Sequence, residues 1–203
     1  MRPSVLLPLA AITLVLTGCG GSDPEKAADP PPSTASVEPD QVCPAKLARS
    51  DDPEENGFGT REDATERPSL PSPQQAWTCQ YDAVDAAQTA DGGTEWAWVL
   101  HGTATEVTEA ELPALNDALD RVVPFTDADR MCTADLGPRW LVVYPGSEGL
   151  VGVVVDDYGC REVRLTDDPA STPPGEAERD GTVPGVLDGG SEVLTALGLG
   201  RTE

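Results

Sequence analysis

The chain has 203 residues, of which 36 are acidic and 13 basic, so its formal net charge at pH 7 is −23. This charge argues against a nucleic-acid-binding protein, which would carry a basic patch, and against a basic helix lying on a membrane. The single His leaves little room for His-based metal or acid–base chemistry, and the length fits one domain with tails.

Residues 1–19 have the pattern of a secretion signal. Arg2 provides a short positive start, and residues 5–16 form an apolar run that only Pro8 and Thr13 interrupt. A transmembrane helix needs about 20 apolar residues, so this run is too short to be one. We therefore predict that the chain is exported.

The apolar run ends in Leu16-Thr17-Gly18-Cys19, which resembles the lipobox of bacterial lipoproteins. The resemblance covers only residues 1–19, and it implies a signal peptide over residues 1–18 that is cut just before Cys19. It also implies that Cys19 carries acyl chains such as palmitate, which would anchor the protein at the extracytoplasmic face of the cell membrane. An ordinary signal peptide that happens to contain a Cys is the alternative interpretation.

Residues 19–40 are rich in Pro, Ser, Asp and Ala and show no apolar periodicity. This composition predicts a disordered, Pro-rich tether between the anchor and the body. Many Ala, Gly, Arg and Asp with only two Lys suggest a high-GC bacterium, and the body resembles the small lipoproteins of such bacteria. That resemblance rests on no family motif, so it implies a location and no activity.

Four cysteines remain after Cys19 is assigned to the lipid: Cys43, Cys79, Cys132 and Cys160. An even number in an exported chain predicts two disulfides, and three pairings exist. We favour Cys43–Cys79 and Cys132–Cys160, because each would close a loop of about 30 to 40 residues. The wide spacings and the lack of a C-x-x-C motif argue against a metal site.

Strands dominate the predicted body. Residues 75–81 and 94–107 alternate apolar and polar side chains on either side of an Asp-Gly-Gly turn, which predicts a hairpin. Thr108 and Glu111 have the spacing of a capping box, and leucines at 112, 115 and 119 form one stripe of a following helix. A short helix is also expected over residues 43–50.

Three further strands are predicted over residues 139–144, 150–156 and 160–166, as an antiparallel meander. The predicted fold is therefore α+β, with an antiparallel sheet of about five strands in the order ββαβββ, one packed helix and two disulfides. We place this domain at residues 41–168. Residues 169–203 are Pro- and Gly-rich, so we predict a tail that contains a short helix over residues 191–199, with Val193, Leu194 and Leu197 as its docking face.

One acidic stretch, residues 52–63, follows the spacing of an EF-hand loop. Oxygen-bearing side chains fall at loop positions 1, 3, 5, 9 and 12: Asp52, Glu54, Asn56, Thr60 and Asp63. Gly57 stands at position 6, but Asp63 replaces the usual Glu, and a Pro-rich sequence follows in place of a helix. We therefore favour a solvated acidic loop over a calcium site, and we predict no metal and no cofactor.

The chain contains no G-x-S-x-G, H-E-x-x-H, P-loop or G-x-G-x-x-G motif. His101, Trp96 and Trp98 fall on a predicted strand, where packing is the expected role. We therefore predict a noncatalytic binding, sensing or assembly module whose partners are the membrane, through its anchor, and an envelope protein, with no nucleic acid. A carrier of lipid or another apolar ligand is one alternative, and a carboxylate-based envelope hydrolase is another.

Overall fold

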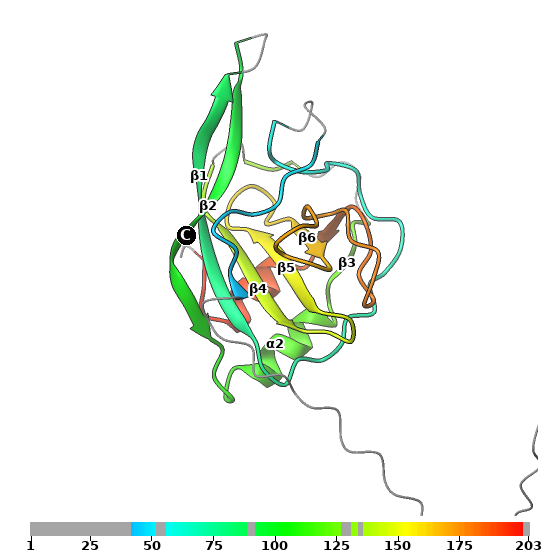
Figure 1. The fold of residues 1–203 in the computed structure, drawn as a ribbon. Helices are drawn as coiled ribbons and strands as arrows, with labels where there is room; N and C mark the ends of the chain where they lie inside the picture. The colour runs from blue at the N-terminus through cyan, green and yellow to red at the C-terminus, as the bar shows by residue number, and fades with distance from the viewer. Residues whose placement is uncertain (1–41, 52–55, 89–91, 127–130, 134–135, 201–203) are drawn as a thin grey trace, which may run out of the picture. The chain divides into compact units, whose positions relative to one another are not determined.

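The structure is a computed structural model that describes residues 42–51, 56–88, 92–126, 131–133 and 136–200. The predicted signal peptide, Cys19 and the tether lie outside these residues. Within them, seven strands form one antiparallel sheet in the order β2-β1-β4-β5-β6-β7-β3, accompanied by two α-helices (Figure 1). No helix in these ranges is long and apolar enough to cross a membrane.

The elements reproduce the predicted ββαβββ order with two short strands added. Their bounds are β1 (Trp77–Gln88), β2 (Thr94–Glu106), α2 (Leu112–Leu119), β3 (Val123–Pro124), β4 (Arg139–Pro145), β5 (Leu150–Asp156), β6 (Val163–Thr166), β7 (Val186–Asp188) and α3 (Gly190–Ala196). The predicted meander is confirmed as β4, β5 and β6, each paired antiparallel with the next.

One face of the sheet is covered by α2 and α3. Successive side chains of a strand point to opposite faces, and Val142, Tyr144 and Val153 point to this one. They are fully buried in one cluster with Leu115 of α2 and Leu194 of α3. Full burial of an aliphatic side chain contributes about 1.5–3 kcal/mol, so this layer is a main source of stability.

The opposite face is covered by the first described segment of the chain. Leu47 is buried there with Trp77 and Leu141, and its backbone N–H donates to the carbonyl oxygen of Trp98 at 3.0 Å. Residues 43–50 are therefore not helical, contrary to the prediction. The middle strand β5 has apolar side chains on both faces, and these side chains are buried because both faces of the strand are covered.

Both predicted disulfides are confirmed. Cys43 pairs with Cys79 at a Cα–Cα distance of 6.0 Å, and Cys132 pairs with Cys160 at 4.9 Å. The first bond joins the segment before the sheet to β1. The second joins the stretch before β4 to the turn before β6. Each bond thus fixes a segment that has little regular structure of its own.

The hairpin of β1 and β2 is longer than predicted. Beyond Tyr81, β1 pairs only with β2, so the two strands form an arm that projects past the rest of the sheet (Figure 1). Gly57 packs closely on this arm: its φ is +83°, and a Cβ there would lie 2.0 Å from the carbonyl oxygen of Trp96. Only Gly fits this contact, which holds the loop around residue 57 beside β2.

The strand count of about five was too low, because β3 and β7 were not predicted. Each has only two or three residues, too few for apolar alternation to be recognised. The structure also differs from the predicted domain end at residue 168. β7 pairs with β6, and Val193 and Leu194 of α3 are buried in the core, so the described residues 169–200 belong to the domain and are not a tail.

The predicted helix after β2 is confirmed as α2. The N–H and the hydroxyl of Thr108 both donate to the Glu111 carboxylate, at 2.9 and 2.7 Å. These bonds, the hydroxyl bond first, lower the pKa of Glu111 below its usual value. The predicted Thr–Glu pairing therefore forms, and regular helix follows from Leu112.

Candidate functional site

Three charged side chains on neighbouring strands form the centre of the candidate site. Arg139 begins β4, Asp156 ends β5, and Arg164 lies in β6. The register places Arg139 directly opposite Asp156 and places Arg164 diagonally beside it, on the face away from the helices. Nε of Arg139 donates to Oδ1 of Asp156 at 2.6 Å, and Nη1 of Arg164 donates to Oδ2 at 2.9 Å. We call these three residues the arginine cluster.

The arginine cluster is almost completely buried. The exposed fraction is 2% for Arg139, 3% for Asp156 and 2% for Arg164. Glu162 supplies a second negative charge, since its Oε2 accepts from Nη2 of Arg164 at 2.6 Å. Burial acts to lower the pKa of Arg164, but Asp156 and Glu162 outweigh it and raise the pKa above its usual value. The guanidinium group of Arg164 therefore stays charged inside the domain.

The cluster also fixes the loop around residues 56–60 to the sheet. Nη2 of Arg139 donates to the carbonyl oxygen of Phe58 at 2.7 Å, and Nε of Arg164 donates to the carbonyl oxygen of Thr60 at 2.9 Å. A guanidinium has five donors in a fixed plane, so one Arg can bind a carboxylate and a loop carbonyl at once.

Aromatic rings complete the surroundings of Arg139. Its guanidinium lies 4.1 Å from the centre of the Trp98 ring, and Tyr158 stacks on the same Trp with ring centres 5.9 Å apart. The hydroxyl of Tyr158 accepts a hydrogen bond of 3.2 Å from Nη2 of Arg139. Burial raises the pKa of Tyr158, so this hydroxyl is neutral. These contacts hold the guanidinium in one orientation.

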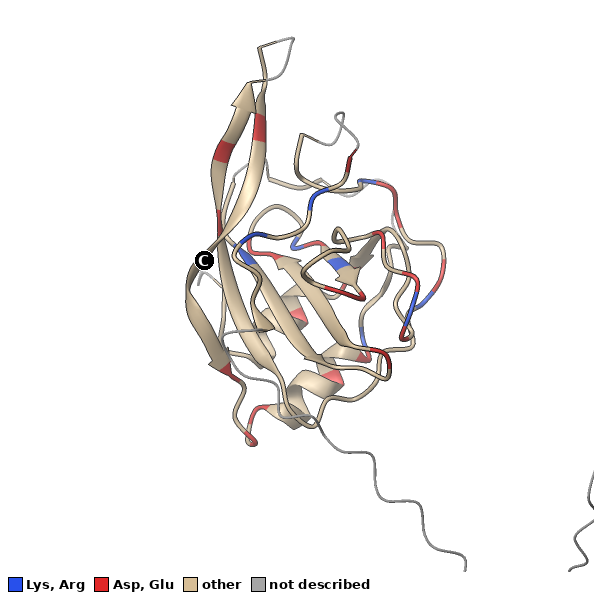
Figure 2. Ribbon diagram, in the orientation of Figure 1, with Lys and Arg blue, Asp and Glu red and all other residues tan. Residues whose placement is uncertain are grey.

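The arginine cluster lines a cavity of about 480 Å³, which we call the arginine cavity. Its charged lining consists of Arg61, Asp63, Arg139, Asp156, Glu162 and Arg164. Phe58, Tyr158 and Cys132 supply the rest of the wall. The formal charges of these three arginines and three acids cancel, although the chain as a whole is strongly acidic. Figure 2 shows acidic residues from the β1–β2 arm to the helices, so the balance is local to the cavity.

A second cavity of about 230 Å³ adjoins the first, since Phe58, Tyr158 and Cys132 line both. Its remaining wall includes Leu136 and Cys160. The Cys132–Cys160 disulfide therefore borders both spaces. Asp156 and Glu162 also line both cavities, whereas the three arginines line only the first, so the second cavity has two acidic side chains beside its apolar ones.

The predicted calcium loop overlaps this site only in part. Asp52 and Glu54 lie outside the described residues. The carbonyl oxygen of Phe58, which would stand at loop position 7, accepts from Arg139, and that of Thr60 accepts from Arg164. The hydroxyl of Thr60 accepts from the backbone N–H of Glu62 at 3.2 Å.

The backbone of Asn56 and the backbone of Asp63, the other described residues of that loop, each pair with another segment. The carbonyl of Asn56 accepts from the N–H of Trp96 at 2.9 Å, and Asp63 forms a β-bridge with Val186. The structure's described ranges contain no group of three or more His, Cys, Asp or Glu side chains suited to a metal ion. Arg139 and Arg164 bind two backbone carbonyl oxygens of the stretch that has the EF-hand spacing.

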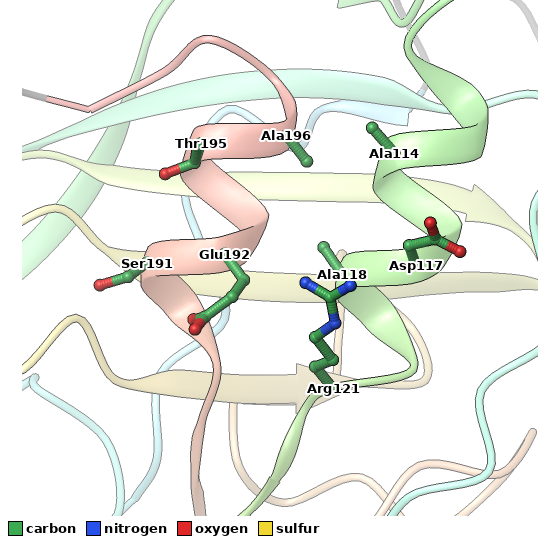
Figure 3. A pocket seen from close by; sticks show the side chains of 8 residues that line it. All are labelled: Ala114, Asp117, Ala118, Arg121, Ser191, Glu192, Thr195 and Ala196. Carbon is green, nitrogen blue, oxygen red and sulfur yellow. The ribbon is translucent and has the colours of Figure 1, made fainter.

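A shallow groove between α2 and α3 is the other concave surface of note (Figure 3). Ala114, Ala118 and Ala196 line it with small side chains, and Glu192 of α3 and Arg121, just after the end of α2, lie at its border. It has no buried charged group and no aromatic side chain. We therefore take the arginine cavity as the candidate site.

His101 lies outside the candidate site. It is exposed on β2, and its Nδ1 is 2.7 Å from Oδ2 of Asp82 on the neighbouring strand. The partly buried position expected from the sequence is thus wrong for this residue. Trp98 is buried, as expected, but it also contacts Arg139 of the cluster.

Sequence reasoning missed the arginine cluster, although a signal for one pair existed. The predicted strands 139–144 and 150–156, joined by a five-residue loop, place Arg139 opposite Asp156 in an antiparallel hairpin. However, the sequence around Arg139 and Asp156 does not show whether an ion pair at the end of a strand is buried or exposed to solvent. Comparison of the chain with protein-family models, curated proteins and solved structures found no match. The site is therefore interpreted from its own geometry.

Proposed function

We propose that the protein is a membrane-anchored, extracytoplasmic lipoprotein whose folded domain is a noncatalytic binding module, with the arginine cavity as its binding site. The observation that carries the proposal is the arginine cluster: charged groups buried to 97% or more that line an open cavity. Maintaining buried charge costs several kcal/mol per ion before pairing, and apolar replacements are often equally stable or more so. A cavity lined in this way is preorganised for a polar ligand.

The anchor is the part of the proposal that the sequence supports. The lipobox resemblance at Leu16-Thr17-Gly18-Cys19 would place lipid on Cys19, and a tether of about 20 residues would separate the membrane from the domain. The two disulfides agree with an oxidising compartment. The cavity would then face ligands or envelope proteins near the outer surface of the membrane.

A binding role is favoured over hydrolysis because the buried carboxylates of the cavity are held in ion pairs. Asp156 binds both arginines of the cluster, and Glu162 binds Arg164. A general acid or base must exchange its proton during the reaction, and a carboxylate fixed by guanidinium groups is poorly placed for that. We infer that these acids position the arginines.

A lipid carrier is favoured less than a binder of a small polar ligand. An acyl chain needs an enclosed apolar space, whereas the arginine cavity is lined by six charged side chains. Both faces of the central strands are filled by buried side chains such as Val154 and Val155. The described part of the sheet therefore offers no apolar cavity for a chain of methylene groups.

Two measurements test the proposal. Cell fractionation should find the protein in the membrane, and Cys19→Ser should move it to the soluble fraction. Native mass spectrometry of the protein extracted in mild detergent should show a reproducible bound mass beyond the acyl chains. Arg61→Gln, at the exposed border of the cavity, should lose that mass, while Arg121→Gln in the α2–α3 groove should keep it. A soluble wild-type protein with no bound mass would contradict the proposal.

A further inference from the structure

We propose that the arginine cavity binds a carboxylate carried on an apolar or aromatic group. This inference rests on the proposed function and names the ligand class of the same site. It follows from which hydrogen-bond donors in the cavity remain free, from the charge balance of the lining, and from the apolar side chains that border part of the adjoining cavity.

The first observation concerns the donors of Arg139. Its Nε binds Asp156, and its Nη2 binds Phe58 and Tyr158. No acceptor among the described residues faces its Nη1, although Arg139 is 98% buried and lines the cavity. Among the described residues, the fully buried side-chain atoms without a hydrogen-bond partner are Nε1 of Trp77 and Trp140, Oδ1 of Asn116 and the hydroxyl of Tyr144. Nη1 of Arg139 is therefore open to the cavity, where water or a ligand oxygen can accept its hydrogen bonds.

The second observation concerns Arg61, which also lines the cavity. It is exposed and forms no ion pair within the part of the chain that the structure describes. A ligand oxygen at Nη1 of Arg139 would have a second guanidinium at the border of the same space. Two guanidinium groups around one anion are the arrangement by which proteins bind carboxylates and phosphates.

Charge decides between those two anions. Asp63, Asp156 and Glu162 line the cavity together with the arginines, so the lining has no net positive charge. The chain's charge of −23 adds a repulsive field. A phosphate carries close to two negative charges at neutral pH, and a carboxylate carries one. The monoanion is therefore the better match to a balanced cavity.

The adjoining cavity identifies what the carboxylate is attached to. Phe58 and Tyr158 border both spaces, and Leu136 borders the second while remaining 38% exposed. An apolar or aromatic group placed there would cover these side chains and would contribute its own transfer free energy. The volume of the arginine cavity, about 480 Å³, is in the range of small-molecule sites, and the adjoining cavity adds about 230 Å³. Either a free aryl carboxylate or the C-terminal residue of a peptide has this chemistry.

The experiment follows the guanidinium signals of the full chain, purified in detergent, by ¹⁵N–¹H NMR. Phenylacetate is the probe, with phenylacetamide, acetate and inorganic phosphate as matched comparisons. Phenylacetate should shift the Nε–H signal of Arg139 more than that of Arg164, whose Nε, Nη1 and Nη2 are each already bonded. Phenylacetate should bind at least about tenfold more tightly than phenylacetamide, which lacks the carboxylate charge, and than acetate, which lacks the aromatic ring.

Variants and a peptide pair complete the test. Arg61→Gln changes an exposed side chain and should weaken phenylacetate binding about tenfold, whereas Arg121→Gln should leave it unchanged. A dipeptide with a free C-terminal Phe, compared with its C-terminal amide, distinguishes the two sources: binding of the free acid alone, more tightly than phenylacetate, would identify a peptide end.

Equal binding of phenylacetate and phenylacetamide, or tighter binding of phosphate, would overturn the inference. So would a shift at Arg164 without one at Arg139. If none of these carboxylates binds, but the membrane-extracted protein carries a mass that Arg61→Gln loses, the proposed binding function stands and only the carboxylate class is wrong. If the membrane-extracted protein also carries no bound mass, both the proposed binding function and the carboxylate ligand class are wrong.

Discussion

Asp156→Asn is the sharpest perturbation of the arginine cluster. It keeps the size of the side chain but removes the charge that two buried guanidinium groups share, at 2.6 and 2.9 Å. The amide oxygen can replace one of these bonds, and the amide nitrogen faces the other guanidinium as a second donor. Removing one partner from a buried ion pair costs about 3–5 kcal/mol, which we expect here. For a domain of this size, the melting temperature should fall by roughly 6–20 °C.

The assay is reversible urea unfolding with both disulfides intact, followed by tryptophan fluorescence. The midpoint should fall while the slope m stays constant, since the same surface is exposed on unfolding. Asp82→Asn is the matched control: its carboxylate pairs with His101 at the surface, and its loss should cost less than about 1 kcal/mol. If Asp156→Asn costs no more than Asp82→Asn, the cluster does not hold β4, β5 and β6 together as described.

Three further changes test the fold independently of the site. Replacing Cys43 and Cys79 together by Ala should cost about 3–4 kcal/mol in the same urea assay, because the bond closes a loop with a sequence separation of 36 residues. Leu194→Ala should cost about 2–5 kcal/mol, since this α3 side chain is 1% exposed in the core; a cost below 1 kcal/mol would show that α3 is a dispensable tail. In an NMR pH titration, Glu111 should titrate below the usual range and Thr108→Val should raise its pKa. Because the folded-state pKa is the lower one, the contribution of Glu111 to stability is present above the unfolded-state pKa and is lost as pH falls through the folded-state value.

Local periodicity explains what the sequence could predict. The hairpin, the meander and α2 each have enough residues for alternation or a 3.6-residue stripe to be recognised. The disulfide pairing followed from loop lengths. The strands β3 and β7 could not be found, because each depends on pairing with a segment far away in sequence. The helix α3 was predicted with Val193, Leu194 and Leu197 as its docking face, and these side chains are buried in the core. Its partners, α2 and β5, could not be named from the sequence.

The candidate site was harder to predict than the fold. Arg139 and Asp156 belong to predicted strands, and their pairing follows from the hairpin register. Their burial depends on the loop at Phe58 and Thr60, whose contribution is two backbone carbonyl oxygens. Every residue has a backbone carbonyl, so the residue types of a loop do not reveal which of its carbonyl oxygens will accept a hydrogen bond from a distant side chain. The acidic composition of that loop predicted a solvated segment, whereas the structure shows guanidinium groups bound to two of its carbonyl oxygens.

The most direct test of the account is a crystal structure of the protein grown with phenylacetate. The account predicts the ligand in the arginine cavity, with a carboxylate oxygen within hydrogen-bond distance of Nη1 of Arg139 and its ring against Phe58 and Tyr158. Density for phenylacetate in the α2–α3 groove, with the arginine cavity holding only water, would contradict the assignment of the binding site.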